Sequence, residues 1–311
     1  MRKTWLCTSA LAALLAASAS PAGAVETGLS PYLKGFSGFM AGYMPPEPGV
    51  YVSNIYYYYH GSAGREVRGG NVELGVDVTM NADALLGTYV TDAKFLGGTY
   101  AVSAAAVYAW ANLDASVVTP LGNRQVSLSQ NGFSDSLIMP VQLGWHAGNF
   151  HWMLSGLVLA PTGGYDPHEL SVGRNIWAFM PQFALTYFDP TAGWDLSTAI
   201  TYVTETKNDA TDYQSGDILH MDWAIGKRFG AGLAWEAGVQ GNIVEQIGAD
   251  RGAGAKLGPF KEQAFGIGPA LGYSTKFGST PVSFSAKWEH DFDTRNTFEG
   301  DVVSATVSVA F

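Results

Sequence analysis

The sequence contains a single cysteine, Cys7, which lies inside an amino-terminal stretch with the layout of a secretory signal peptide. Arg2 and Lys3 precede an apolar run at 5–17, and the small residues at 22–24 form a cleavage site, so we predict that residues 1–24 are removed. The mature chain then has no cysteine, which excludes disulfides, thiolate metal ligands and a cysteine nucleophile. Cys7 also lies too far from the cleavage point to be lipidated.

Basic clusters and long apolar runs are absent as well. Loss of Arg2 and Lys3 takes the formal net charge from −10 to −12. Nucleic-acid binding requires clustered Lys and Arg, so no nucleic-acid partner is expected. After the signal peptide, no apolar stretch approaches the roughly 20 residues of a membrane-spanning helix. Such a chain can cross a membrane only as a closed β-barrel, which satisfies the backbone in hydrocarbon without helices.

Apolar and polar residues instead alternate with a period of two. The odd-numbered residues from Val303 to Phe311 are apolar, and most residues between them are Ser or Thr. Taken alone, such a segment also fits an edge strand of a soluble sandwich. Similar patterns predict antiparallel strands at 49–60, 70–91, 96–111, 135–146, 150–160, 174–188, 194–205, 216–229, 232–246, 263–277, 282–293 and 301–311.

These segments predict an all-β fold, a transmembrane antiparallel β-barrel of about 12 strands over residues 49–311. Fourteen strands are the alternative, if 70–91 is two strands and 113–130 adds another. Short turns alternate with longer polar loops, as in bacterial outer-membrane barrels, so we predict that location and outer-membrane lipid and lipopolysaccharide as surroundings. The Gly- and Pro-rich residues 25–48 are expected in the periplasm or in the lumen. The terminal Phe311 is expected to contact the barrel assembly machinery.

Residue types that carry catalysis or hold metals do not form a convincing site. The six histidines show neither an H-E-x-x-H pair nor a histidine placed beside a serine on one strand face. Asp166, His168 and Glu169 lie close together in a predicted outer loop, where such residues are usually solvated surface. We therefore predict no enzyme activity, no catalytic residue, no metal site and no cofactor.

The predicted lumen carries charged residues, because side chains that alternate with lipid-facing ones must point inward. They can impose a field on a passing solute, or they can form salt bridges that plug the barrel. The candidates for lining the lumen and the transport path are His220, Asp222, Arg228, Glu236, Glu245, Lys287, Glu289 and Asp291.

Two loop segments carry a family resemblance. The segment 208–217, NDATDYQSGD, is similar to the N-x-x-T-D-Y-x-S-G-D segment of an outer-membrane family labelled "Putative MetA-pathway of phenol degradation". Residues 161–166, PTGGYD, and 173–177, GRNIW, also resemble stretches of that family, as do 133–135 with Pro140. The resemblance covers nearly the whole mature chain, and it implies a transporter-like barrel linked to aromatic catabolism. It implies no catalytic residues.

The functional prediction is an outer-membrane channel or transporter for small organic solutes such as aromatic compounds. Tyr165, Asp166, Asp212 and Tyr213 are predicted to form the outer mouth of its path. The alternative is a structural or sealed barrel whose outer loops bind a partner.

Overall fold

A computed structural model describes residues 30–67, 72–119, 122–256 and 261–311. The predicted signal peptide, 1–24, lies outside these residues. The strands are β1 (Gly49–Val67), β2 (Val72–Phe95), β3 (Gly98–Thr119), β4 (Gly122–Phe133), β5 (Ser136–Ala147), β6 (Phe150–Ala160), β7 (Ala178–Asp189), β8 (Trp194–Glu205), β9 (Ile218–Phe229), β10 (Trp235–Gln246), β11 (Gln263–Phe277), β12 (Thr280–Arg295) and β13 (Glu299–Ala310). A 3₁₀ turn, η2 (Ala231–Leu233), precedes β10. In the described part of the chain, no helix is long and apolar enough to span a membrane.

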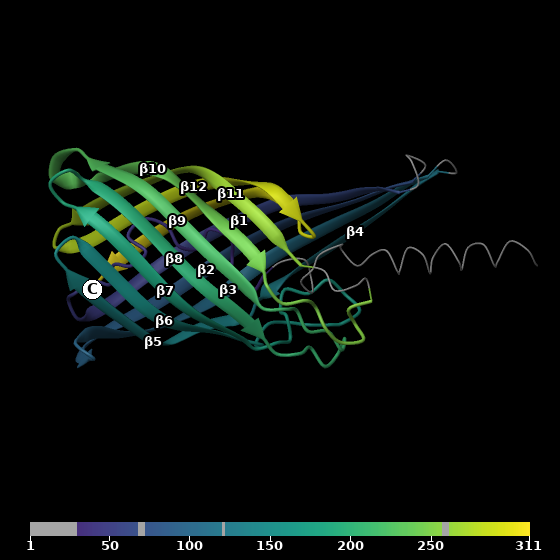
Figure 1. The fold of residues 1–311 in the computed structure, drawn as a ribbon, viewed down its shortest axis with the longest axis horizontal. Coiled ribbons are helices and arrows are strands. Elements are labelled where there is room, and N and C mark those ends of the chain that lie inside the picture. Colours follow the sequence, from purple (N-terminus) through teal and green to yellow (C-terminus); the bar gives the residue numbers. More distant parts are fainter. Residues whose placement is uncertain (1–29, 68–71, 120–121, 257–260) are drawn as a thin grey trace, which may run out of the picture.

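Twelve of these strands close into one antiparallel barrel (Figure 1). Each strand pairs with its neighbour in sequence, except that β3 pairs with β5 across the inserted β4. The barrel closes where β1 pairs with β13, from Tyr51 opposite Ala310 to Ser62 opposite Glu299. The predicted twelve-stranded barrel is therefore confirmed, and a soluble sandwich with free edges is excluded.

Strand β4 is the main difference from the sequence prediction. It pairs with residues 108–119 of β3 only, and its other edge pairs with no strand of the described chain. Strands β1 to β4 extend past the rest of the barrel, towards the upper right of Figure 1. The stretch 113–130 does contain an additional strand, but β2 is a single strand, so the fourteen-strand alternative is wrong. Nearly every residue of β4 is exposed on both faces, which leaves no apolar periodicity to detect.

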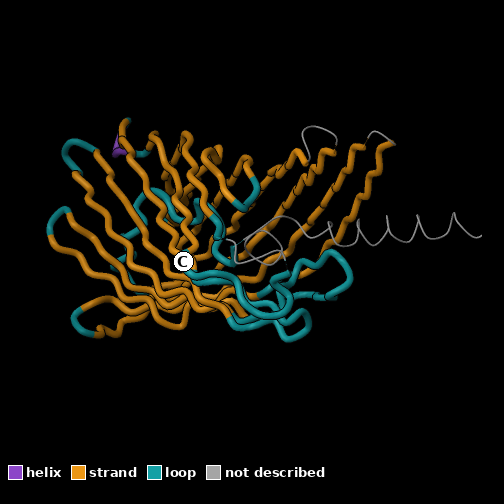
Figure 2. Tube along the Cα trace, turned by 45° about the vertical axis from the view of Figure 1, so that its right-hand side comes forward, coloured by secondary structure: helices purple, strands orange, loops and turns teal. Residues whose placement is uncertain are grey.

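The long loops all lie at one end of the barrel (Figure 2). Tight turns such as 96–97, 148–149 and 278–279 lie at one end, together with the start of β1 and Phe311. In the first of these turns, Leu96 and Gly97 both adopt positive φ, 50° and 79°, as two-residue hairpin turns require. The loops 161–177, 206–217 and 247–262 lie at the other end. By the rule for this class of barrel, the short turns face the periplasm and the long loops face outside.

The outward face of the barrel is apolar, as a membrane-embedded wall requires. Val239, Leu271 and Trp288 are 42–46% exposed, although each is large and apolar. Aromatic pairs lie near the short-turn end, with Trp235 against Tyr273 at 4.5 Å between ring centroids. Closed pairing, an apolar wall and an aromatic girdle together place the protein in the bacterial outer membrane.

We expect Val239→Arg to lower the free energy of unfolding from lipid vesicles by about 2–4 kcal/mol, because Val239 lies in the middle of the lipid-facing wall. The matched control is Phe229→Arg at the last residue of β9, where the cost falls to about 0–1 kcal/mol near the interface. Urea titration of both variants measures the difference. Equal losses would mean that the apolar band is placed wrongly.

Candidate functional site

Residues 30–48 lie inside the barrel, which is one of the two places considered from the sequence. Ser30 Oγ lies 3.0 Å from Nε2 of His220 on β9, near the long-loop end. Further along, the Met40 amide donates to Asp195 on β8 at 2.8 Å, and the Gly42 amide donates to Thr186 on β7 at 2.9 Å. The segment therefore runs down the lumen and meets β1 at the short-turn end. We call residues 30–48 the lumenal segment.

An ion pair holds the lumenal segment to β12. Lys34 Nζ lies 2.7 Å from Asp291 Oδ2, and the two side chains are 6% and 0% exposed. The ammonium group also lies 5.6 Å from the ring centroid of Tyr59, and the Tyr57 hydroxyl donates to the Lys34 carbonyl. Both tyrosines are buried and face the lumen. Lys34 is the only cationic residue of the lumenal segment, and among the described residues its pair with Asp291 is the one ion pair that the segment forms.

Asp222 and Glu289 hold the same part of the segment. One oxygen of Asp222 accepts hydrogen bonds from the Tyr32 hydroxyl at 2.8 Å and from the Ser37 amide at 3.0 Å. The Glu289 carboxylate lies against Gly35, where a Cβ atom would come within 2.4 Å of it. Gly35 has φ 64°, so both its conformation and the lack of space favour glycine.

The remaining predicted lumen residues pair with each other or lie elsewhere. Arg228 Nε donates to Glu236 at 3.0 Å across β9 and β10, and Lys287 lies 3.8 Å from Glu289. Glu245 was placed wrongly, because its neighbours Val244 and Gln246 are fully buried and the side chain therefore points to the outer face. Its spacing of nine from Glu236 is odd, and an odd spacing cannot keep two residues on one strand face.

Four of the predicted lumen residues are too buried to border an open aqueous path. His220, Asp222, Glu289 and Asp291 are 0–1% exposed, and each contacts the lumenal segment or other wall residues. From the sequence, the same inward positions were expected either to act on a passing solute or to form salt bridges that plug the barrel. Period-two patterning identifies the inward face, but it does not reveal that another part of the chain fills the space.

Sequence reasoning missed an apolar ring in the lumen beneath the long loops. The ring packs around Tyr32 and Phe36 of the lumenal segment, and its buried members are Met139, Leu157, Met180, Val203, Ile218, Val244 and Ala264. They come from β5 to β11, and each occupies the inward face close to the outer end of its strand. Their position on the inward face could be counted from the sequence, because alternate residues of a strand share a face. Single apolar residues on an otherwise polar face give too weak a signal to be recognised.

A second missed feature is a pocket in the wall near β3 and β5. It has a volume of about 410 Å³ and is lined by small or apolar residues that include Gly87, Ala104 and Pro140. The pairing of β5 is interrupted here, with register shifts against β3 at 101–103 and against β6 at 138–141. Pro140 has no N–H to donate to a neighbouring strand, which is the physical reason for an interruption at this place. The sequence signal for this interruption was Pro140, a proline inside a predicted strand.

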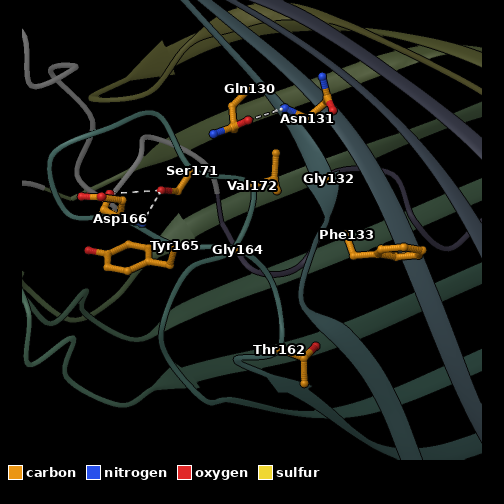
Figure 3. A pocket seen from close by; sticks show the side chains of 10 residues that line it. All are labelled: Gln130, Asn131, Gly132, Phe133, Thr162, Gly164, Tyr165, Asp166, Ser171 and Val172. Atoms are coloured by element: carbon orange, nitrogen blue, oxygen red, sulfur yellow. Dashed lines mark hydrogen bonds between the residues drawn. The ribbon is translucent and has the colours of Figure 1, made fainter.

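The four predicted outer-mouth residues divide into two groups. Tyr165 and Asp166 line a pocket of about 380 Å³ between the base of β4 and the loop after β6, together with Phe133 and Gln130 (Figure 3). Asp212 and Tyr213 belong to the neighbouring loop and are not among the residues lining this pocket. The Asn208 amide donates to the Tyr165 hydroxyl at 2.8 Å and so connects the two loops.

Hydrogen bonds and charge stabilise the outer loops. Asp212 accepts from Lys207 at 3.0 Å and from the Ala253 amide at 3.1 Å, and the Lys207 contact holds the pKa of Asp212 below its usual value. The Tyr213 hydroxyl donates to Asp250 at 2.6 Å. Burial raises the pKa of Asp250. The hydrogen bonds that its carboxylate accepts from Tyr213, the Gly216 amide and Gln246 lower that pKa in part. The loops thus form a connected layer over the barrel.

The sequence profile of the family described as "Putative MetA-pathway of phenol degradation" matches residues 62–307. The chain belongs to this family. The resemblance seen in the loop motifs is therefore confirmed. No curated protein matches the sequence.

Solved structures share the architecture at low identity. An outer membrane channel from Pseudomonas putida F1 matches with a TM-score of 0.57 and 14% identity, over 86% of this chain and 97% of that one. The CymD monoaromatic hydrocarbon channel gives 0.42 and 10%, over 85% and 89% of the two chains. A FadL homologue from Pseudomonas aeruginosa gives 0.42 and 8%, over 84% and 90%. The first of these matches shows that the family member has the fold of an outer-membrane channel.

Breaking the Lys34–Asp291 pair is expected to loosen the lumenal segment. Lys34→Met leaves Asp291 buried without a counter-charge, a change that typically costs about 3–5 kcal/mol. Single-channel recordings in planar bilayers should then show more frequent or larger ion conductance than the wild type. Lys207→Met is the matched control, because it removes a largely exposed pair in an outer loop.

The double variant Lys34→Met/Asp291→Asn should recover part of the closed state, because it removes the unpaired charge as well. If Lys34→Met conducts no more than the control, the segment is held in place without this ion pair.

Proposed function

We propose that this protein is a channel for small apolar organic compounds, aromatic compounds among them, and that the lumenal segment closes the path to water and ions. The apolar ring under the long loops carries this proposal. A pore for hydrophilic solutes needs a continuous water-filled lumen. The lumen of this barrel has buried apolar side chains at the level where a solute arrives from outside.

Such a ring favours apolar over polar solutes by simple transfer energetics. Burial of apolar surface contributes about 25 cal/mol per Å². A sugar of similar size would lose hydrogen bonds to water at the ring, and nothing there would replace them. The wall pocket near Pro140 supports the same solute class, because its lining is small or apolar and it opens on the lipid-facing wall, where Tyr89 and Ile138 are exposed.

The alternative is a sealed barrel whose outer loops bind a partner. The filled lumen and the pocket lined by Tyr165 and Asp166 favour it. The two functions differ in whether solute uptake depends on the protein and on the apolar ring.

The test is uptake of labelled phenol, benzoate and a sugar by cells with and without the gene. We expect gene-dependent uptake of the aromatic compounds and not of the sugar. Met139→Gln/Met180→Gln keeps the side-chain size but makes the ring polar, at a cost of at least about 1 kcal/mol, so uptake should fall by about fivefold or more. Met221→Gln, on the outward face of β9, is the control and should not lower uptake.

Equal uptake with and without the gene would overturn the channel proposal and leave the sealed barrel. Gene-dependent uptake that the ring variant does not change would place the path elsewhere, and the wall pocket would be the next region to alter.

A further inference from the structure

Two histidines at the short-turn end of the lumen have no part in the proposed function. His146 on β5 and His151 on β6 are directly opposite each other across the hairpin. Their Nδ1 atoms are 2.7 Å apart. Tyr43 of the lumenal segment packs against both imidazoles, with ring centroids 5.1 and 4.9 Å away. The pair is therefore at the inner surface of the barrel, next to the point where the segment leaves the lumen.

The hydrogen bond between the two rings places the lone pair of one Nδ1 atom in the space between them. Only one proton can lie between the two Nδ1 atoms, so one ring donates and the other accepts. The backbone of Met44 forms a hydrogen bond with His146. We assign this hydrogen bond to Nε2–H of His146, because Nδ1 already contacts His151, and Nδ1 of His146 is then the acceptor. Metal-binding histidines show this arrangement, in which a backbone group orients one ring nitrogen while the other nitrogen faces the ion.

We propose that His146 and His151 bind a divalent transition-metal ion of the Zn²⁺, Ni²⁺ and Cu²⁺ class through their Nδ1 atoms. Imidazole nitrogen suits this class of ion. Both rings stay neutral, because the proton between them moves to Nε2 of His151 when the ion takes its place.

The geometry requires a small adjustment. Two nitrogens at about 2.0 Å from a tetrahedral ion are about 3.3 Å apart, so the rings must separate by roughly half an ångström from their hydrogen-bonded distance. His146 is exposed, and the two-residue turn at 148–149 follows closely, which leaves room for this movement.

Water completes the coordination sphere. In the described ranges, no group of three or more His, Cys, Asp and Glu side chains is placed to hold a metal ion. Asp195 lies near enough to His151 to act on it electrostatically, and its negative charge favours a bound cation. With two protein ligands and an open position, the ion can exchange from the short-turn side.

Calorimetric titration of the tag-free, refolded protein in detergent with ZnCl₂ tests the proposal. The wild type should show one saturable site. Removing a residue that only hydrogen-bonds to a metal ligand typically weakens metal binding about 10–100-fold. His146→Gln and His151→Gln each remove a ligand itself, so each should weaken Zn²⁺ binding by at least about tenfold. His290→Gln is the matched control, because His290 is exposed and paired with Asp301 on the outer face.

One equivalent of Cu²⁺ should give an electron paramagnetic resonance spectrum with coupling to two nitrogens in the wild type and in His290→Gln. Zn²⁺ should also protect His146 and His151 of the wild-type protein from diethylpyrocarbonate, a readout that needs no variant to fold. No saturable binding, or equal binding by wild type and His151→Gln, would overturn the proposal.

Discussion

Hydrogen bonding of the backbone in hydrocarbon is the constraint on which the rest of this structure depends. An unpaired N–H or C=O group costs several kcal/mol inside a bilayer, so the first and last strands must find each other. They do so through the β1–β13 pairing, although its partners are separated by nearly the whole chain. Among the strands that the structure describes, β4 has a partner on one edge only. Such an edge is tolerated only in water, which places the projecting part of β1 to β4 outside the membrane.

Closure with twelve strands creates a second problem, because the ring encloses more space than its own inward side chains fill. The lumenal segment occupies that space. It is held by wall carboxylates that accept from Lys34, Tyr32 and backbone amides. The strands alternate strictly, so these carboxylates have to point inward. The same residues that suggest a charged channel from the sequence therefore bind the segment that fills the lumen.

The sequence predicted the elements whose physical signal is local. Strands β12 and β13 alternate cleanly because one face meets lipid, and the tight turns at 148–149 and 278–279 fall between predicted strands. Strand β4 was missed because it is solvated on both faces, and solvation on both faces imposes no alternation. Glu245 was misplaced because its charge, and not its parity with Glu236, was used to assign its face.

The sequence by itself determined that this chain crosses the outer membrane as a barrel of about twelve strands, and to which family it belongs. Those properties depend on composition, on a period of two and on loop motifs, all of which are local. Only the tertiary structure decided that Lys34 reaches Asp291, that an apolar ring surrounds Tyr32, and that His146 and His151 meet Tyr43. These contacts join residues of the lumenal segment to strands far along the chain. The closed barrel confines the lumenal segment and so decides which wall residues it meets. Local sequence patterns contain no information about these partners.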